Sequence, residues 1–234
     1  MKPAGGPGRL AILGASGNAL DILDIVSALN AAGEAWDVVG VLDAAAGPSF
    51  AGVPVLGSLA AAAAMICPGG MLEGAQFLLA IGSDRSHAAR EAILARTGLV
   101  QASFATLVHP AAGVSSRATL APGCCVGFGA SVAGRARLGA HAWVGPGVVI
   151  GHDAMLDPFA MMAPRATISG GVRIGRGAYV GSGAVVRQGI AVGARALVGL
   201  GAVVVKDVAP DTVVAGNPAR PLHPIEAGTP LARG

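Results

Sequence analysis

A six-residue repeat runs without interruption through the second half of this chain. An apolar residue stands at every sixth position from 108 to 204, which makes seventeen consecutive positions. A small or β-branched residue, such as Ala118 or Val172, follows each of them four residues later. An α-helix would need a period of about 3.6 residues, and a flat sheet would show alternation with turns of variable length. The period of six instead predicts a parallel β-helix in which three hexads close one coil of about 18 residues.

The coil length also predicts which residues stack on one another. Residues one coil apart lie above each other, at a spacing of about 4.8 Å. We therefore expect Gly134 below His152 and Gly170 above it, at a corner outside the aliphatic core. No side chain from either neighbouring coil would then cover the imidazole. The same column continues through Gln188 to Lys206, which would lie three coils above His152, at about 14 Å.

The first half of the chain is predicted to form a small parallel βαβ sheet. A strand at 9–13 leads into a glycine turn at 14–17 and a helix, and strands at 36–42 and 76–81 and a helix at about 86–97 follow. The carboxyl ends of parallel strands meet at one edge of a sheet, where N–H groups at a helix N-terminus attract phosphate. Glycine needed only for tight turning is the alternative. The residues predicted to bind a nucleotide at this edge are Gly14, Ser16, Gly17, Asn18, Asp43, Gly82 and Ser83.

Charge is unevenly distributed along the chain. The net charge is +3, but residues 1–107 carry five Lys or Arg against eight Asp or Glu, whereas residues 108–207 carry nine against three. Proteins that bind single-stranded nucleic acid also need exposed aromatic side chains, of which the second half has few. The basic half therefore favours a small polyphosphate ligand over nucleic acid. Because the sequence has no apolar run of about 18 residues and no signal-peptide stretch before Arg9, we expect a soluble, cytoplasmic protein without a membrane partner.

Several motifs resemble those of one family. Besides the repeat, they include Gly-Ala-Ser-Gly at 14–17, Ile-Gly-His-Asp at 150–153 and a closing Gly-Asn-Pro-Ala-Arg at 216–220. Over nearly its whole length the chain resembles the bacterial sugar acetyltransferases that include the sialic acid O-acetyltransferase (NeuD) and bacillosamine-precursor N-acetyltransferase (PglD) groups. The resemblance implies a homotrimer with active sites between subunits. It implies three regions, namely a Rossmann-like nucleotide-sugar-binding domain at 1–107, a left-handed β-helix at 108–210 and a C-terminal capping tail at 211–234.

The same resemblance implies a chemistry. We expect an acetyl-CoA-dependent enzyme that N-acetylates a nucleotide-linked 4-amino sugar in bacterial surface-glycan biosynthesis. Transfer from a thioester needs a base for the proton of the attacking amine and a donor for the developing oxyanion. His152 matches the family's catalytic histidine and Gly170 its oxyanion donor, while Asp153 either orients the imidazole or is a solvated corner carboxylate. Acetyl-CoA is expected along Gly170, Gln188, Lys206 and Arg220, and no metal is expected.

The chain departs from the family pattern at three positions. Asn18 and Met161 stand where relatives commonly have histidines, and Ala44 replaces a second acidic residue after Asp43. A methionine cannot reproduce the N–H donor of an imidazole. The departures leave alternatives open: O-acetylation of sialic acid or another sugar, a non-catalytic nucleotide-sugar-binding relative, and a metal-dependent hydratase. The last would need histidines spaced to bind zinc, and the histidine intervals of this chain do not match that arrangement.

Overall fold

A largely parallel sheet forms the centre of the first part of the chain, in the computed structural model that describes residues 8–99 and 103–225. Its elements are β1 (Gly8–Leu13), α1 (Gly17–Ala31), β2 (Trp36–Leu42), β3 (Ser49–Phe50), β4 (Val53–Gly57), β5 (Ala75–Leu79) and α2 (Arg90–Ala95), with short 3-10 helices at Leu59–Ala61, Ala63–Ile66 and His87–Ala89. The strand order is β3-β4-β2-β1-β5. β1 pairs in parallel with β2 and β5, β2 pairs in parallel with β4, and β3 and β4 form an antiparallel hairpin.

Most of these elements match the sequence predictions. The strand at 36–42 is confirmed, and α1 follows the glycine turn as expected. The third predicted strand is wrong at its end, because β5 stops at Leu79 and the carbonyl of Ala80 accepts hydrogen bonds from side chains of the glycine turn. The β3–β4 hairpin has no counterpart among the predicted elements.

The predicted helix at 86–97 is shorter than expected. A 3-10 turn precedes α2, and α2 itself ends at Ala95. The hydroxyl of Thr97 donates to the carbonyl of Leu94 at 2.7 Å, and Gly98 then adopts a φ of 67°, which ends the helix. No helix in the described ranges is long and apolar enough to cross a membrane. Residues 1–7 and 100–102 of the predicted first domain, and residues 226–234 of the predicted tail, lie outside the described residues.

The second part of the chain is a parallel β-solenoid, as the period of six predicts. Its coils have three sides, each formed by a ladder of short strands. The first side contains β6 (Leu107–Val108), β9 (Cys125–Val126), β12 (Trp143–Val144), β15 (Met161–Met162), β18 (Tyr179–Val180), β21 (Leu197–Val198), β23 (Thr212–Ala215) and β24 (Arg220–Pro224). The second contains β7 (Gly113–Val114), β10 (Ser131–Val132), β13 (Val149–Ile150), β16 (Thr167–Ile168), β19 (Val185–Val186) and β22 (Val203–Val204). The third contains β8 (Thr119–Leu120), β11 (Arg137–Leu138), β14 (Met155–Leu156), β17 (Arg173–Ile174) and β20 (Ala191–Val192).

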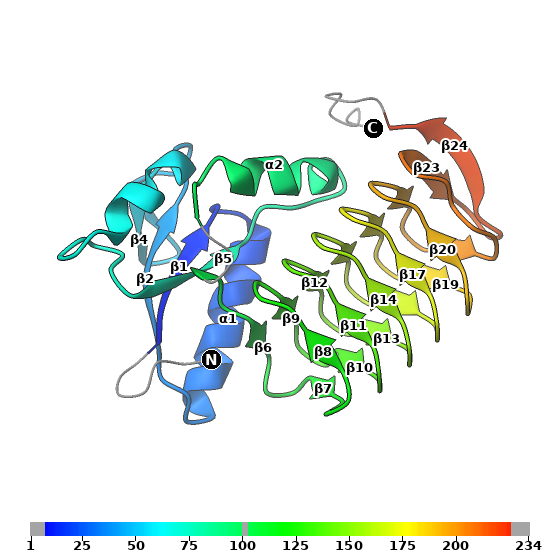
Figure 1. Cartoon of the computed structure of the whole chain (residues 1–234), viewed down its shortest axis with the longest axis horizontal. Helices are drawn as coiled ribbons and strands as arrows, with labels where there is room; N and C mark the ends of the chain where they lie inside the picture. Colours follow the sequence, from blue (N-terminus) through cyan, green and yellow to red (C-terminus); the bar gives the residue numbers. More distant parts are fainter. Residues whose placement is uncertain (1–7, 100–102, 226–234) are drawn as a thin grey trace.

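The register of these ladders confirms the coil length. Val132 pairs with Ile150, and Ile150 pairs with Ile168, so that each residue lies beside the residue 18 positions later. Antiparallel pairing occurs at the end of the first side, where β24 folds back on β23. Figure 1 shows the coils stacked in one row, with β24 at the end far from the first unit.

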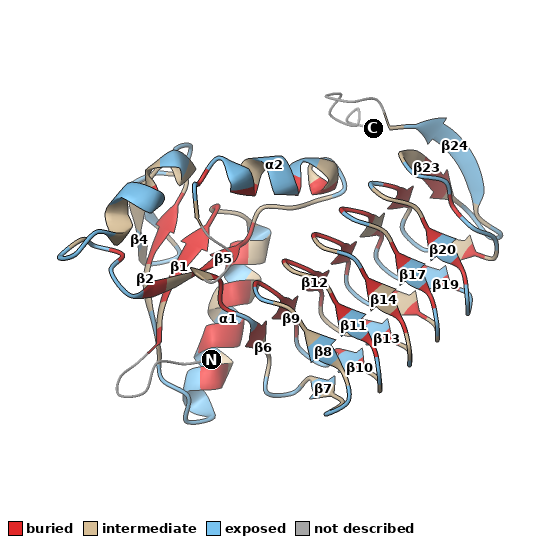
Figure 2. Ribbon diagram, viewed as in Figure 1, coloured by how far each residue is buried: buried red, intermediate tan, exposed pale blue. Residues whose placement is uncertain are grey.

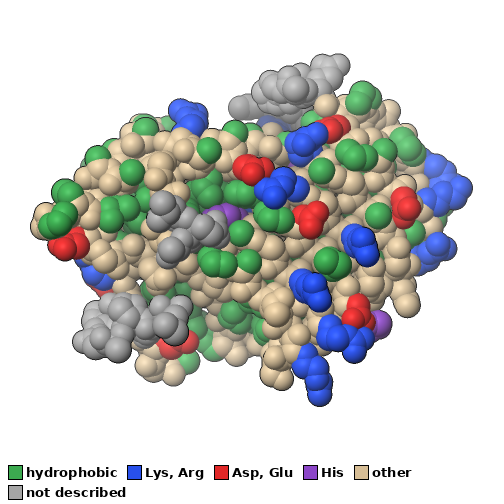
Figure 3. Space-filling model, viewed as in Figure 1, with side chains coloured by type: hydrophobic (Ala, Val, Ile, Leu, Met, Phe, Trp, Pro, Cys, Tyr) green, Lys and Arg blue, Asp and Glu red, His purple; other side chains and the backbone are tan. Residues whose placement is uncertain are grey.

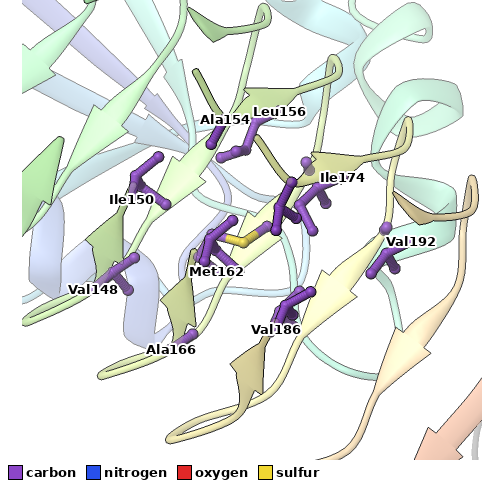
Figure 4. Packing of buried hydrophobic residues seen from close by; sticks show 14 of the residues in the cluster. Val148, Ile150, Ala154, Leu156, Met162, Ala166, Ile174, Val186 and Val192 are labelled. Atoms are coloured by element: carbon purple, nitrogen blue, oxygen red, sulfur yellow. The ribbon is translucent and has the colours of Figure 1, made fainter. Parts of the chain in front are cut away.

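The interior of the solenoid is an aliphatic column. The repeated apolar residues from 126 to 204 are each at most 2% exposed, and they pack on the small residues that follow four positions later (Figures 2 and 4). Burial of each Val, Leu, Ile or Met side chain contributes about 1.5–3 kcal/mol. The corners between strands need a left-handed residue, such as Gly171 or Gly189 with φ of 66° and 74°. This requirement explains part of the glycine content, because other corners hold residues such as Arg135 and Asp153 in the same conformation.

The first unit packs against the first side of the solenoid (Figure 1). The outward-facing residues Cys125, Trp143 and Met161 of that side belong to the same buried cluster as Leu10 and Ile12 of β1. The hydrophobic core of the first unit is thus continuous with the surface of the solenoid.

Arg90 joins the two parts of the chain by hydrogen bonds. Its side chain is 1% exposed, and its guanidinium donates to the carbonyls of Ile81 at 2.9 Å, His141 at 3.0 Å and Phe159 at 2.9 Å. Burial lowers the pKa of Arg90 to about 10, so the group stays charged at neutral pH. One side chain therefore fixes the turn that follows β5 to two neighbouring coils.

His141 makes the stability of this interface sensitive to acid. The imidazole is 1% exposed, and burial together with the charge of Arg90 lowers the pKa of His141 to about 4. Folding favours the neutral form of His141. The stabilisation that comes from this preference is complete above pH 6.5 and is lost as the pH falls toward 4. We expect His141→Phe to reduce the loss of unfolding free energy between pH 7 and pH 4.5 by up to about 3 kcal/mol. Urea unfolding at both pH values measures this, and an unchanged loss would contradict it.

Candidate active site

His152 lies at the corner between the second and third sides of the solenoid. The corner follows β13, and its left-handed residue is Asp153, with a φ of 60°. The His152 side chain is 64% exposed, as the two stacked glycines predict. A Cβ atom added to Gly170 would lie 2.7 Å from Nε2 and Cε1 of His152. The imidazole therefore lies against the backbone of Gly170, in space that only glycine leaves open.

Asp153 holds the other ring nitrogen. Its Oδ2 lies 2.8 Å from Nδ1 of His152. Arg135 and His152 both hydrogen-bond to this carboxylate, and together they hold the pKa of Asp153 well below its usual range. An ionised carboxylate can only accept, so Nδ1 carries the proton and Nε2 has a free lone pair in the neutral ring. The Asp153 side chain contacts the imidazole and is also 39% exposed, so its role in orienting His152 stays a prediction.

The N–H of Gly170 takes no part in the hydrogen bonds of the strand ladder. Proline, which has no N–H, occupies the same hexad position at 146, 158 and 164, so the ladder does not use this donor. In the described part of the chain, the N–H of Gly170 donates to no protein acceptor. An imidazole with a free Nε2 and a backbone N–H without a protein acceptor thus belong to the same corner, and acyl transfer requires a base and such a donor.

The predicted cofactor residues lie farther along the solenoid. Gln188 is exposed at the same corner one coil above Gly170, and Lys206 follows one coil later. Lys206 and Arg220 line one cavity of about 480 Å³ at the far end of the solenoid, together with the apolar side chains of Val204 and Val214. On the face shown in Figure 3, Lys and Arg side chains are more numerous over the solenoid than over the first unit.

The predicted nucleotide turn is assembled by hydrogen bonds between its segments. The carboxylate of Asp43 accepts from the N–H of Ala15 at 2.9 Å. The side chains of Ser16 and Asn18 both donate to the carbonyl of Ala80 at 2.9 Å. Gly14 has a φ of 103°, and a Cβ there would lie 2.3 Å from Ile81, so this position requires glycine.

The first turn of α1 offers backbone donors at this edge. The hydroxyl of Ser16 bonds to Ala80 and does not cap the helix. The first helical hydrogen bond is donated by Ala19, so the N–H groups of Gly17 and Asn18 precede it. Such groups bind anions. Ser83, in contrast, is engaged within its own turn, where its hydroxyl lies 3.2 Å from that of Ser86.

Asn18 and Met161, where the resemblance led us to expect histidines, both contact Gly82. Asn18 donates to the carbonyl of Gly82 at 2.8 Å. A Cβ added to Gly82 would lie 2.5 Å from Sδ of Met161, which is 3% exposed. Met161 therefore packs on the predicted nucleotide turn from the first side of the solenoid, whereas His152 occupies the corner opposite that side.

Sequence reasoning missed one residue of the His152 corner. Arg135 donates from Nε to Oδ1 of Asp153 at 2.6 Å and from Nη2 to Oδ2 at 2.7 Å. Arg135 stands 18 positions before Asp153, so the stacking that placed Gly170 above His152 also contained this signal. Among residues 8–99 and 103–225, no group of three His, Cys, Asp or Glu side chains is arranged to hold a metal ion.

Known structures resemble the chain over almost its full length. No family model matches the sequence, and no curated protein matches it. The acetyltransferase domain of PglB from Neisseria gonorrhoeae is 31% identical, with a TM-score of 0.79 over 92% of this chain and 99% of that chain. The chain belongs to the hexapeptide-repeat sugar acetyltransferases.

A second member of these acetyltransferases is also similar. PerB from Caulobacter crescentus, in complex with CoA and GDP-perosamine, is 28% identical, with a TM-score of 0.76 over 92% of this chain and 98% of that chain. The PglB domain has also been solved in complex with acetyl coenzyme A. Membership of the hexapeptide-repeat sugar acetyltransferases identifies the protein as an acetyltransferase and its solenoid as a left-handed β-helix.

Proposed function

We propose that this acetyltransferase moves the acetyl group of acetyl-CoA to the amine of a nucleotide-linked amino sugar. The observation that carries the proposal is the placement of the His152 imidazole, which contacts Asp153, against Gly170, whose N–H donates to no acceptor in the described part of the chain. Support comes from the two similar proteins, one solved with acetyl coenzyme A and the other with CoA and GDP-perosamine. We infer that the amine belongs to a 4-amino sugar of bacterial surface-glycan biosynthesis, and that the reaction occurs in the cytoplasm.

The residues of the corner have separate roles in this reaction. Acetyl-CoA supplies an acetyl group activated as a thioester. Nε2 of His152 removes a proton from the amine as its nitrogen attacks the carbonyl carbon. The N–H of Gly170 donates to the carbonyl oxygen while that oxygen gains negative charge. The C–S bond then breaks, the new amide keeps the acetyl group, and the imidazolium returns its proton to the departing sulfur.

The column above His152 fits the length of the second substrate. Lys206 stands three coils above His152, at about 14 Å. We place the pantetheine arm along Gly170 and Gln188, and the phosphates beside Lys206 and Arg220, because the two cations line one cavity.

Replacing Lys206 tests this placement. We expect Lys206→Ala to raise the KM for acetyl-CoA about five- to tenfold and to leave kcat nearly unchanged, because the lost contact is made equally before and during the reaction. Initial rates at varied acetyl-CoA measure this. Arg96→Ala, an exposed arginine of the first unit, is the control. An unchanged KM in Lys206→Ala would contradict the placement.

We propose that the first unit is a Rossmann-like domain and that it binds the nucleotide of the sugar substrate. The diphosphate would bind at the N–H groups of Gly17 and Asn18, at the carboxyl ends of β1 and β5. Gly14 allows the close approach of the turn. Asp43 and Ser83, whose side chains are engaged in the turns themselves, would shape this site.

A homotrimer with active sites between subunits would bring the two substrates together. Within one chain the first unit lies on the first side, opposite the His152 corner, so a nucleotide sugar held there faces away from His152. The exposed apolar side chains Val149 and Val185 (44% and 37%) lie on the second side, and Phe128 and Leu200 (62% and 83%) lie at the corner before it. In a trimer whose threefold axis is faced by the second side of each solenoid, the His152 corner of one subunit would lie against the neighbouring subunit. It would then be close to that neighbour's first unit.

A substrate panel tests the function. Purified protein is incubated with acetyl-CoA and UDP-, GDP- or dTDP-linked 4-amino sugars, with sialic acid as the O-acetylation alternative, and free thiol is measured. We expect thiol release with at least one amino sugar. Release only with sialic acid would favour the O-acetyltransferase alternative. Release with none, while nucleotide sugars raise the Tm, would favour a non-catalytic binding protein.

A further inference from the structure

We propose that Arg135 is a positioning residue for the catalytic histidine, acting through Asp153. This inference rests on the proposed function, because it assigns His152 as the base. The three side chains form one chain of hydrogen bonds, from Arg135 to Asp153 at 2.6 and 2.7 Å and from His152 to Asp153 at 2.8 Å. Arg135 comes from the coil below, so two coils cooperate at one corner.

The contact has the geometry of a fixed carboxylate. Nε and Nη2 of Arg135 bind one oxygen each, which is the bidentate arrangement that planar guanidinium favours. Oδ2 is shared between Arg135 and His152. Because both oxygens are engaged, the carboxylate cannot rotate freely, and the direction of its bond to Nδ1 fixes the plane of the imidazole. The ring then presents Nε2 to Gly170.

Arg135 also changes the electrostatics of the pair. An unshared carboxylate beside Nδ1 would favour the protonated imidazole, which cannot act as a base. The guanidinium offsets part of that negative charge. The coil above His152 contributes only Gly170 and Gly171 at the facing positions, and the coil below contributes Gly134 and Arg135. Arg135 and Asp153 are therefore the charged groups that face the imidazole from its own and neighbouring coils in the described structure.

The pH dependence of catalysis separates positioning from a structural role. We expect Arg135→Gln to lower kcat on the order of tenfold and to shift the acid limb of the pH–rate profile to higher pH. Arg135→Lys keeps the charge without the bidentate contact, so its acid limb should stay near that of the wild type while kcat falls. Asp153→Asn should shift the acid limb in the opposite direction.

A control variant and an NMR measurement make the test of Arg135 independent of the identity of the substrate. Arg117 occupies the equivalent position one coil lower and is exposed, so Arg117→Gln should change neither kcat nor the acid limb. Titration of the His152 ring by NMR reports the same shift without turnover. If the panel shows no acetyl transfer but the NMR midpoint of His152 still rises in Arg135→Gln, the proposed function fails. The influence of Arg135 on His152 through Asp153 would still be supported. If the wild type is active and Arg135→Gln leaves both the acid limb and the NMR midpoint unchanged, the role of Arg135 is overturned.

Discussion

His152→Gln should lower kcat for acetyl transfer by about 10³-fold, with little change in the KM for acetyl-CoA. Glutamine has nearly the reach of histidine but cannot take a proton, and positioned bases contribute about 10²–10⁴-fold. Nothing in the neighbouring coils replaces the imidazole, because Gly134 and Gly170 stand below and above it. Thiol release with the best substrate of the panel measures the effect.

The matched control for this variant is His223→Gln. His223 lies in β24 and is exposed, far along the chain from the His152 corner. It should keep wild-type activity. If His152→Gln retained more than about a tenth of the wild-type kcat, a base other than His152 would have to be sought.

Arg90→Met should cause the largest loss of stability among single changes in the interface. Methionine fills a similar volume, but it leaves the carbonyls of Ile81, His141 and Phe159 without their buried donor. Each buried group left unsatisfied costs about 1–3 kcal/mol. We expect the free energy of unfolding to fall by about 3–5 kcal/mol. Denaturant unfolding measures this.

Arg96→Met provides the comparison. This arginine follows α2 directly and is exposed, so its replacement should change the unfolding free energy by less than about 0.5 kcal/mol. Equal effects in the two variants would show that the hydrogen bonds of Arg90 do not join the first unit to the solenoid. A loss confined to Arg90→Met would support the view that this side chain fixes the turn at Ile81 to the coils.

The repeat made much of the second part predictable. Each hexad buries one aliphatic residue and one small residue, so the period alone determines which side chains point inward and which stack. The approach of Gly170 to His152 follows from that rule, and so does the contact between Arg135 and Asp153. In contrast, the roles of Gln188, Lys206 and Arg220 depend on a bound substrate and remain proposals.

The first unit was less predictable, because its contacts join segments that are distant in sequence. An arginine in a helix is usually exposed, and no local pattern in the sequence indicates that Arg90 is buried against two coils of the solenoid. The packing of Met161 on Gly82 likewise depends on how the sheet lies against the solenoid. Asn18 and Met161 lie far apart in sequence, but both contact Gly82. The two positions where the resemblance led us to expect histidines are therefore close together in the structure.

The most direct test of the central claim is the mass and linkage of the product. The wild-type protein is incubated with acetyl-CoA and the nucleotide-linked 4-amino sugar that releases most thiol, and the sugar is examined by mass spectrometry and NMR. We predict that the sugar gains one acetyl group on its nitrogen for each thiol released, and that His152→Gln forms almost none. Thiol release without acetylation of the sugar, or equal product from the variant, would contradict the account.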